Sequence, residues 1–233
     1  MRRKIILQRG QDPDLFMHEF EIEGGPGMVV LDAIHQIQAE DAPDLAVRWN
    51  CKAGKCGSCS AEVNGMPKLL CMTRLSDYDE KEPLIVKPMK TFPIIKDLVV
   101  DRSAFDRIQQ AGGFISINTS GNTQDANAIP IDKHNADMAF DAATCIGCGA
   151  CVASCKNASA MLFVSAKVSQ YALLPQGKVE ATDRVLNMVN QMDEEGFGNC
   201  TNTGACEVEC PKGISLENIA RLNREYLWAS TKG

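Results

Sequence analysis

Four cysteines between residues 145 and 155 constrain this chain more than any other feature. They lie in the sequence Cys-Ile-Gly-Cys-Gly-Ala-Cys-Val-Ala-Ser-Cys, which has the spacing C-x2-C-x2-C-x3-C. This spacing holds iron-sulfur clusters, and its fourth cysteine normally binds a neighbouring cluster. The run therefore requires a second group of cysteines, and Cys200, Cys206 and Cys210 supply it.

A separate group of cysteines precedes this run. Its members are Cys51, Cys56, Cys59 and Cys71. The spacing C-x4-C-x2-C with a distant fourth cysteine is that of plant-type 2Fe-2S ferredoxins. Asn64-Gly65 is a strong hairpin-turn signal, and the hairpin would return Cys71 to the loop. Four cysteines can also hold zinc, but the x4 gap and the glycine-rich loop favour iron.

Composition limits the other uses of these cysteines. The chain has 233 residues, eleven cysteines and a net charge of -6. Disulfides are not expected, because the count is odd and the cytoplasm keeps thiols reduced. The acidic balance argues against a nucleic-acid partner. The apolar stretch in MRRKIILQRG is too short for a secretory signal, and no run is long enough to span a bilayer.

The sequence predicts an α+β protein with two domains. Residues 1–105 form a plant-type 2Fe-2S ferredoxin domain of the β-grasp kind, and 106–233 a helical domain of bacterial-type ferredoxin character. Strands are expected at Arg3–Gln8, Phe16–Glu23, Ser60–Val63, Lys68–Leu70 and Pro83–Lys87.

Helices and connections follow from the apolar periodicity of the remaining segments. Helices are expected at Val29–Glu40, from Thr91–Asp101 through Gln110, and over most of the chain after Met138. A last helix is capped by Ser215, with Leu227 on its apolar stripe. Gly112–Asp137 is rich in turn-forming residues and is expected to be a long surface connection.

The swapped fourth cysteine divides the later groups into two sets. The first set is a 4Fe-4S site formed by Cys145, Cys148 and Cys151. Its fourth thiolate comes from Cys210, which precedes proline as in the bacterial motif. Cys155 joins Cys200 and Cys206, and Thr203 stands where a further cysteine would complete the set. Three thiolates most simply hold a 3Fe-4S cluster. A 4Fe-4S cluster with water or the Thr203 oxygen on its fourth iron is the alternative.

No catalytic residue is assigned to this chain. It has no dinucleotide fingerprint, phosphate loop or nucleophile triad in a convincing context. Three clusters in one chain therefore predict a carrier of electrons that transforms no organic substrate itself.

The chain carries the three cysteine groups in this order together with three short stretches: CGSC at Cys56–Cys59, CPKG at Cys210–Gly213 and FPIIKDLVVD at Phe92–Asp101. In these features it closely resembles the iron-sulfur subunit of succinate dehydrogenase and fumarate reductase. The resemblance covers nearly the whole chain. It implies a respiratory complex, linked to the tricarboxylic acid cycle, with a flavoprotein subunit that binds FAD and a cytochrome b membrane anchor that binds quinone and haem b. Electrons would run between FAD and quinone through the 2Fe-2S, 4Fe-4S and 3Fe-4S clusters. The chain would be peripheral, on the cytoplasmic face of the inner or plasma membrane.

Two departures from many ubiquinone-linked members concern the quinone end. Lys156-Asn157-Ala158 replaces a proline followed by tryptophans, and Thr201 replaces a histidine. These departures favour menaquinone and a single dihaem anchor subunit. The alternatives are a subunit of another flavin-linked oxidoreductase, a cluster-based redox sensor and a zinc-stapled interaction protein.

Overall fold

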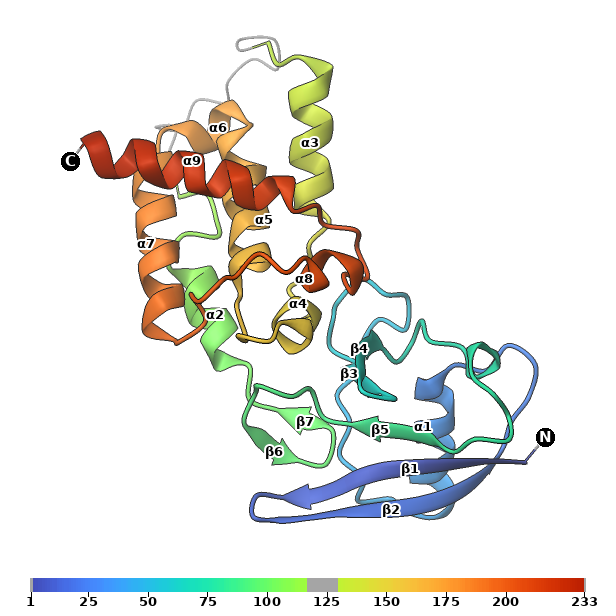
Figure 1. Cartoon of the computed structure of the whole chain (residues 1–233). Helices are drawn as coiled ribbons and strands as arrows, with labels where there is room; N and C mark the ends of the chain where they lie inside the picture. Colours follow the sequence, from blue (N-terminus) through green and yellow to red (C-terminus); the bar gives the residue numbers. More distant parts are fainter. Residues whose placement is uncertain (1, 117–129, 233) are drawn as a thin grey trace. The chain divides into compact units, whose positions relative to one another are not determined.

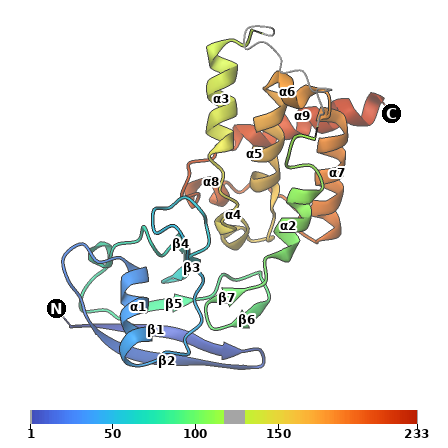
Figure 2. The ribbon, with the colours of Figure 1, turned by 180° about the vertical axis from the view of Figure 1, so that it is seen from behind.

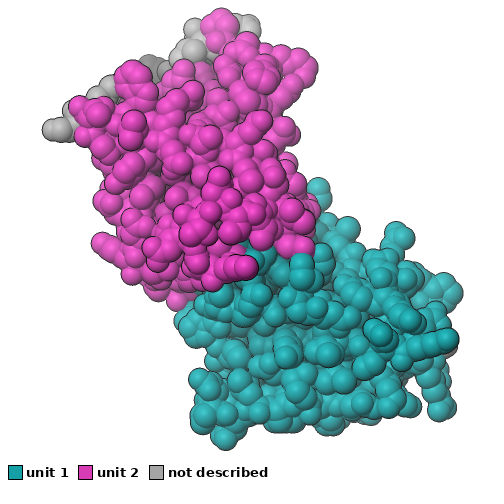
Figure 3. Space-filling view, viewed as in Figure 1, with its two compact units in different colours: residues 1–102, 146–154 teal, residues 103–145, 155–233 magenta. Residues whose placement is uncertain are grey.

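The computed structural model describes residues 2–116 and 130–232 (Figure 1). The chain divides into two compact units, which Figure 3 colours separately. The first comprises Met1–Arg102 and Ile146–Ser154, and the second comprises Ser103–Cys145 and Cys155–Gly233. Apart from the short helices α1, η1 and α4, the first unit is built on strands, whereas the second is helical, which confirms the predicted α+β composition.

A five-stranded sheet forms the frame of the first unit. Its order is β2-β1-β5-β3-β4, with β1 and β5 parallel and the other pairs antiparallel. The first two predicted strands are confirmed; they are longer than predicted and pair as an antiparallel hairpin. The strands are β1 (Arg2–Gln11), β2 (Asp14–Glu23), β3 (Ser60–Val63), β4 (Met66–Leu69) and β5 (Leu84–Lys87).

The predicted first helix is α1 (Val30–Glu40), and it lies beside β1 and β5 in both ribbon views (Figure 2). Its apolar stripe is fully buried, as expected for an amphipathic helix that covers a sheet. At its start, the Asp32 carboxylate accepts a hydrogen bond from the Val29 N–H at 3.2 Å. The stripe packs with alternate residues of β1, such as Ile5 and Leu7, in one hydrophobic core.

A short β-ribbon, β6 (Ile94–Lys96) and β7 (Val99–Val100), replaces part of the segment that was expected to lead directly into a helix. Its turn places Asp97 at φ +49° with the side chain buried. The Asp97 carboxylate accepts hydrogen bonds from Arg9 Nε at 3.1 Å and from the Gly10 and Ala46 N–H groups at 2.7 Å. These contacts fix the chain that leads toward Cys51. The 3-10 helix η1 (Leu75–Asp77) completes this unit with α4 (Ala150–Ser154).

The second unit is organised around α5, whose residues are buried on most sides. It packs against α3, α7 and α9. The helices are α2 (Ser103–Gln110), α3 (Lys133–Ala143), α5 (Met161–Ala172), α6 (Pro175–Lys178), α7 (Ala181–Glu194), α8 (Ala205–Val208) and α9 (Glu217–Lys232).

The prediction of a connection through Asp137 is wrong at its end. Helix α3 begins at Lys133, because Asp132 caps it by accepting a hydrogen bond from the Asn135 N–H at 2.9 Å. The middle of the predicted connection, 117–129, lies outside the described residues. Leu227 is 69% exposed, so its expected place on the buried stripe of α9 is also wrong. In the part of the chain that the structure describes, no helix has the length and apolarity needed to span a membrane.

Candidate iron-sulfur sites

The first cysteine group lies in a loop and a hairpin of the first unit. Cys59 directly precedes β3, and β3 and β4 pair through a turn in which Asn64 and Gly65 have φ of +49° and +80°. Both residues of a type I′ turn need positive φ, so the predicted hairpin is confirmed. The Leu70 N–H then donates to the Cys59 carbonyl at 3.1 Å, which brings Cys71 back beside Cys59.

Backbone N–H groups face the sulfur atoms of this loop. The N–H groups of Ala53 and Lys55 donate to Cys51 Sγ at 3.4 and 3.3 Å. Positive φ values at Lys52 and Gly54, +52° and +60°, turn the backbone so that these groups point inward. Such hydrogen bonds stabilise negative charge on sulfur and tune the potential of a bound cluster.

The loop holds its sulfurs in contrasting surroundings. Burial raises the pKa of Cys56, but hydrogen bonds from Ser58 and Cys51 outweigh it and lower the pKa to about 6. Burial raises the pKa of Cys59 to about 12. A hydrogen bond from the Cys71 backbone lowers this pKa, whereas the Cys71 side chain raises it. Cys59 and Cys71 are buried, whereas Cys51 and Cys56 are half-buried. One edge of the site therefore faces the core and the other faces the surface.

Aromatic and basic side chains lie on the surface beside Cys51. Lys52 Nζ lies 4.8 Å from the centre of the Trp49 ring and 3.2 Å from His35 Nδ1. Burial, followed by the nearby Lys52 charge, lowers the pKa of His35. These contacts give His35 a packing role on the surface of the loop.

The second unit brings the three cysteines of the last set to one small cavity. Cys155, Cys200 and Cys206 line it, and so does Thr203. Burial raises the pKa of Cys206, backbone N–H groups lower it, and the neighbouring Cys155 and Cys200 raise it. The sequence prediction that Thr203 stands with these cysteines agrees with the residues that line the cavity.

Hydrogen bonds between distant segments build this cavity. The Ala160 N–H donates to the Phe197 carbonyl at 2.9 Å, and Asn157 Nδ2 donates to Thr201 Oγ1 at 3.0 Å. The Leu216 N–H donates to the Glu207 carboxylate at 2.8 Å, which ties α8 to the start of α9. The cavity thus depends on three stretches of chain that are far apart in the sequence.

The remaining four cysteines occupy ordered positions in their own units. In the first unit, Cys148 and Cys151 are buried on α4 and the turn before it. In the second, the Cys145 carbonyl accepts a hydrogen bond from Lys167 Nζ at 3.2 Å, and Cys210 Sγ accepts one from the Ile214 N–H at 3.4 Å.

The donor sets suit iron-sulfur clusters. Thiols are the ligands of such clusters, and N–H groups aimed at sulfur tune their potentials. The preference for iron over zinc stays a prediction from the x4 gap and the glycine-rich loop. Sequence reasoning missed Ser58, although its place inside the C-x2-C gap was a usable signal.

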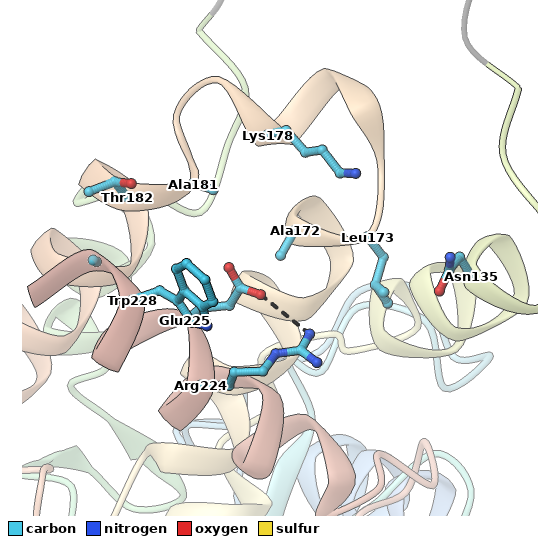
Figure 4. A pocket seen from close by; sticks show the side chains of 10 residues that line it. Asn135, Ala172, Leu173, Lys178, Ala181, Thr182, Arg224, Glu225 and Trp228 are labelled. Atoms are coloured by element: carbon cyan, nitrogen blue, oxygen red, sulfur yellow. Dashed lines mark ion pairs between the residues drawn. The ribbon is translucent and has the colours of Figure 1, made fainter. Parts of the chain in front are cut away.

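A further hollow lies away from these residues, in the second unit (Figure 4). It measures about 620 Å³ and is lined by side chains that include Lys178, Arg224, Glu225 and Trp228. Trp228 is 61% exposed and forms part of the lining of this hollow. None of the eleven cysteines lines this hollow.

Comparisons with known proteins agree with these sites. Residues 4–107 match the 2Fe-2S iron-sulfur cluster binding domain family, and 141–214 match the 4Fe-4S dicluster domain family. The succinate dehydrogenase iron-sulfur subunit of Bacillus subtilis is 33% identical over 95% of this chain and 90% of the relative. The chain belongs to the iron-sulfur subunits of succinate dehydrogenase and fumarate reductase.

Two further relatives support this membership. The fumarate reductase iron-sulfur subunit of Wolinella succinogenes is 30% identical over 90% of this chain and 89% of the relative. A chain of the Mycobacterium smegmatis Sdh1 complex in the apo form matches 99% of this chain and 96% of its own length, with 30% identity and a TM-score of 0.75. The predicted fold class, an N-terminal 2Fe-2S ferredoxin domain followed by a dicluster domain, is confirmed. The expected 2Fe-2S, 4Fe-4S and 3Fe-4S clusters are those of this family, and the chain is an electron-transfer subunit of an oxidoreductase.

Proposed function

We propose that this chain transfers electrons between the FAD of a flavoprotein subunit and quinone or haem b in a membrane anchor, with the chain itself peripheral on the cytoplasmic face of the membrane. Iron-sulfur clusters supply one-electron oxidation and reduction when bound. The chain's residues supply the thiolates, the hydrogen bonds to sulfur and the burial. The observation that most supports the proposal is the pair of cysteine sites, each assembled within one compact unit of the same chain.

The ligand assignment is part of the proposal. It rests on the spacing of the cysteines, and the structure supports it at the first and last sets. The proposed ligands are Cys51, Cys56, Cys59 and Cys71 for 2Fe-2S; Cys145, Cys148, Cys151 and Cys210 for 4Fe-4S; and Cys155, Cys200 and Cys206 for 3Fe-4S. A division into a 2Fe-2S domain over 1–105 and a dicluster domain over 106–233 belongs to the same proposal. The unit boundary after Arg102 lies near the proposed one, but Ile146–Ser154, with Cys148 and Cys151, belongs to the first compact unit.

The third cluster is proposed to be 3Fe-4S because of Thr203. This residue lines the cavity with three cysteines and offers a neutral hydroxyl where a fourth thiolate would be required. A hydroxyl is a weaker ligand for iron than a thiolate, so a fourth iron would be held poorly. The smaller number of thiolates also predicts a higher potential than that of the 4Fe-4S cluster.

Menaquinone and a dihaem anchor are the finer part of the proposal. The residues that depart from the ubiquinone pattern, Asn157 and Thr201, hydrogen-bond each other at 3.0 Å on the exposed surface. The Asn157 amide nitrogen and the Thr201 hydroxyl are thus paired with each other. Spectra of the purified complex test the haem content directly: two b-type haems per complex are expected, and a haem-free anchor would contradict the dihaem proposal.

Anaerobic mixing of the purified complex with succinate tests the function. We expect the visible absorbance of the clusters to bleach as they are reduced, and fumarate to restore part of it. A Cys56→Ser variant serves as the control, because it removes a proposed 2Fe-2S ligand at the half-buried edge of the loop. Metal analysis that finds zinc and little iron would contradict the proposal and establish the zinc alternative.

A further inference from the structure

In the first unit, the 2Fe-2S loop lies in van der Waals contact with the later cysteine segment. Gly57 has φ +70°, and a Cβ added there would lie 3.0 Å from both Cα and Cβ of Cys148 and 3.1 Å from the Ile146 oxygen. Real Cβ atoms essentially never come closer than this to other heavy atoms. A Cβ at this position would have to push its neighbours aside, so the backbone beside Cys56 and the backbone of Cys148 are direct neighbours.

Core packing fixes the later segment against the first unit. Cys148 and Ala150 are 8% and 2% exposed and belong to the same hydrophobic core as the sheet. On the other side of the segment, a Cβ at Gly149 would lie 3.0 Å from the end of Met89 and 3.2 Å from the Phe92 ring. The segment is therefore held from both sides, and its distance from the 2Fe-2S loop is set by packing.

One side chain bridges the two loops. Arg102 Nη1 donates to the Gly57 carbonyl at 3.4 Å, and Arg102 Nη2 donates to the Gly147 carbonyl. Each carbonyl belongs to a residue next to a proposed cluster ligand, Cys56 in one loop and Cys148 in the other. The Gly57 carbonyl also accepts a hydrogen bond from the Ser60 hydroxyl at 2.8 Å, which orients it toward the bridge. The planar guanidinium fork suits two acceptors at once, which a lysine ammonium on a flexible stem does not.

We infer that Arg102 is a positioning residue that fixes the 2Fe-2S loop against the Cys148 segment and, through its charge, raises the reduction potentials of both clusters. This inference rests on the proposed ligand assignment. Each cluster gains negative charge on reduction, and a cation held within a few ångströms of the ligand backbone stabilises the reduced form. Half-burial limits solvent screening, so the charge acts on both sites together.

Redox titration of the purified complex, followed by EPR, tests the inference on Arg102→Gln and Arg102→Lys. The glutamine variant removes the charge, and we expect the potentials of the 2Fe-2S and 4Fe-4S clusters both to shift in the negative direction. The lysine variant keeps the charge but loses the fork, and we expect potentials near those of the wild type with a lower melting temperature of the complex. Arg48→Gln is the matched control, because Arg48 is an exposed arginine just before the same loop.

The outcomes separate this inference from the proposed function. An Arg102→Gln complex with full iron content and two unchanged potentials overturns the inference alone. An equal shift in Arg48→Gln also overturns it, because the effect would then be unspecific. If the glutamine variant does not assemble, a lysine variant whose potentials both fall overturns the role of the charge. A wild-type complex without 2Fe-2S and 4Fe-4S signals would instead contradict the proposed function.

Discussion

The 2Fe-2S loop and the three-cysteine cavity bring their cysteines together in opposite ways. The loop takes its four cysteines from one short stretch, in which a hairpin returns the last to the others. The cavity takes three cysteines from segments separated by α5, α6 and α7, and depends on hydrogen bonds such as that from Asn157 to Thr201. The first site is therefore local in the sequence, and the second exists only when the helical unit has folded.

The difference also concerns charge. Four thiolates surround the first site, whereas three thiolates and the neutral Thr203 surround the second, and backbone N–H groups donate to sulfur at both. Fewer thiolates mean less negative charge, which favours the reduced cluster. By this effect the cluster in the cavity should have a higher potential than the 4Fe-4S cluster, which also has four thiolates.

Loss of one cavity cysteine is the largest change that we predict. Cys206→Ala leaves two thiolates, too few to hold the third cluster, and should reduce succinate-dependent quinone reduction to background. Succinate oxidation with an artificial acceptor that takes electrons from the flavoprotein should continue. Loss of both activities, with the 2Fe-2S signal also absent, would show that the cavity and the loop do not assemble separately.

Adding a thiolate to the cavity is the next largest change. Thr203→Cys should convert the third cluster toward 4Fe-4S, because the cavity then offers four sulfur ligands, and should lower its potential. EPR before and after reduction measures both effects. Thr203→Ser, which keeps the hydroxyl, is the control and should leave the 3Fe-4S signal unchanged. Full iron content with an unchanged spectrum in the cysteine variant would contradict the assignment of this position.

A pair of glycine substitutions sharpens the account of the loop. Gly57 and Gly65 both have positive φ, +70° and +80°, but a Cβ at Gly65 meets nothing within 4 Å. An alanine held at such a positive φ lowers the stability of the fold by on the order of 1 to 3 kcal/mol. Gly57→Ala should destabilise the complex by more than Gly65→Ala, because it also collides with Cys148, and should reduce the iron content. Equal melting temperatures and equal iron content in the two variants would show that the 2Fe-2S loop and the Cys148 segment shift to accommodate the added Cβ.

The smallest effect is expected from the hydrogen bond at the edge of the cavity. Asn157→Ala removes an exposed bond to Thr201, and such a bond contributes roughly 0.5 to 1.5 kcal/mol. The melting temperature should fall slightly, and the 3Fe-4S signal should remain. Gln36→Ala, which removes an exposed amide bond to Glu40 on α1, is the matched control. A large loss of quinone reductase activity in Asn157→Ala alone would place Asn157 in the quinone site.

Much of the loop could be predicted from the sequence, because its information is local. The Asn64-Gly65 turn and the stripe of α1 are short-range patterns, and the structure confirms both. The predicted start of helix α3 was too late. The stretch Lys133–Asp137 is mostly polar, and the cap at Asp132 was not recognised. The hydrogen bonds from Arg102 to the Gly57 and Gly147 carbonyls could not be predicted, since they join residues that are far apart in the chain and meet only in the folded unit.

EPR of the anaerobically purified complex tests the central claim most directly, which is that the eleven cysteines hold two clusters with four thiolates and one with three. The oxidised complex should show a 3Fe-4S signal, and reduction should remove it and bring up a 2Fe-2S signal. An oxidised complex with full iron content and no 3Fe-4S signal would contradict the account.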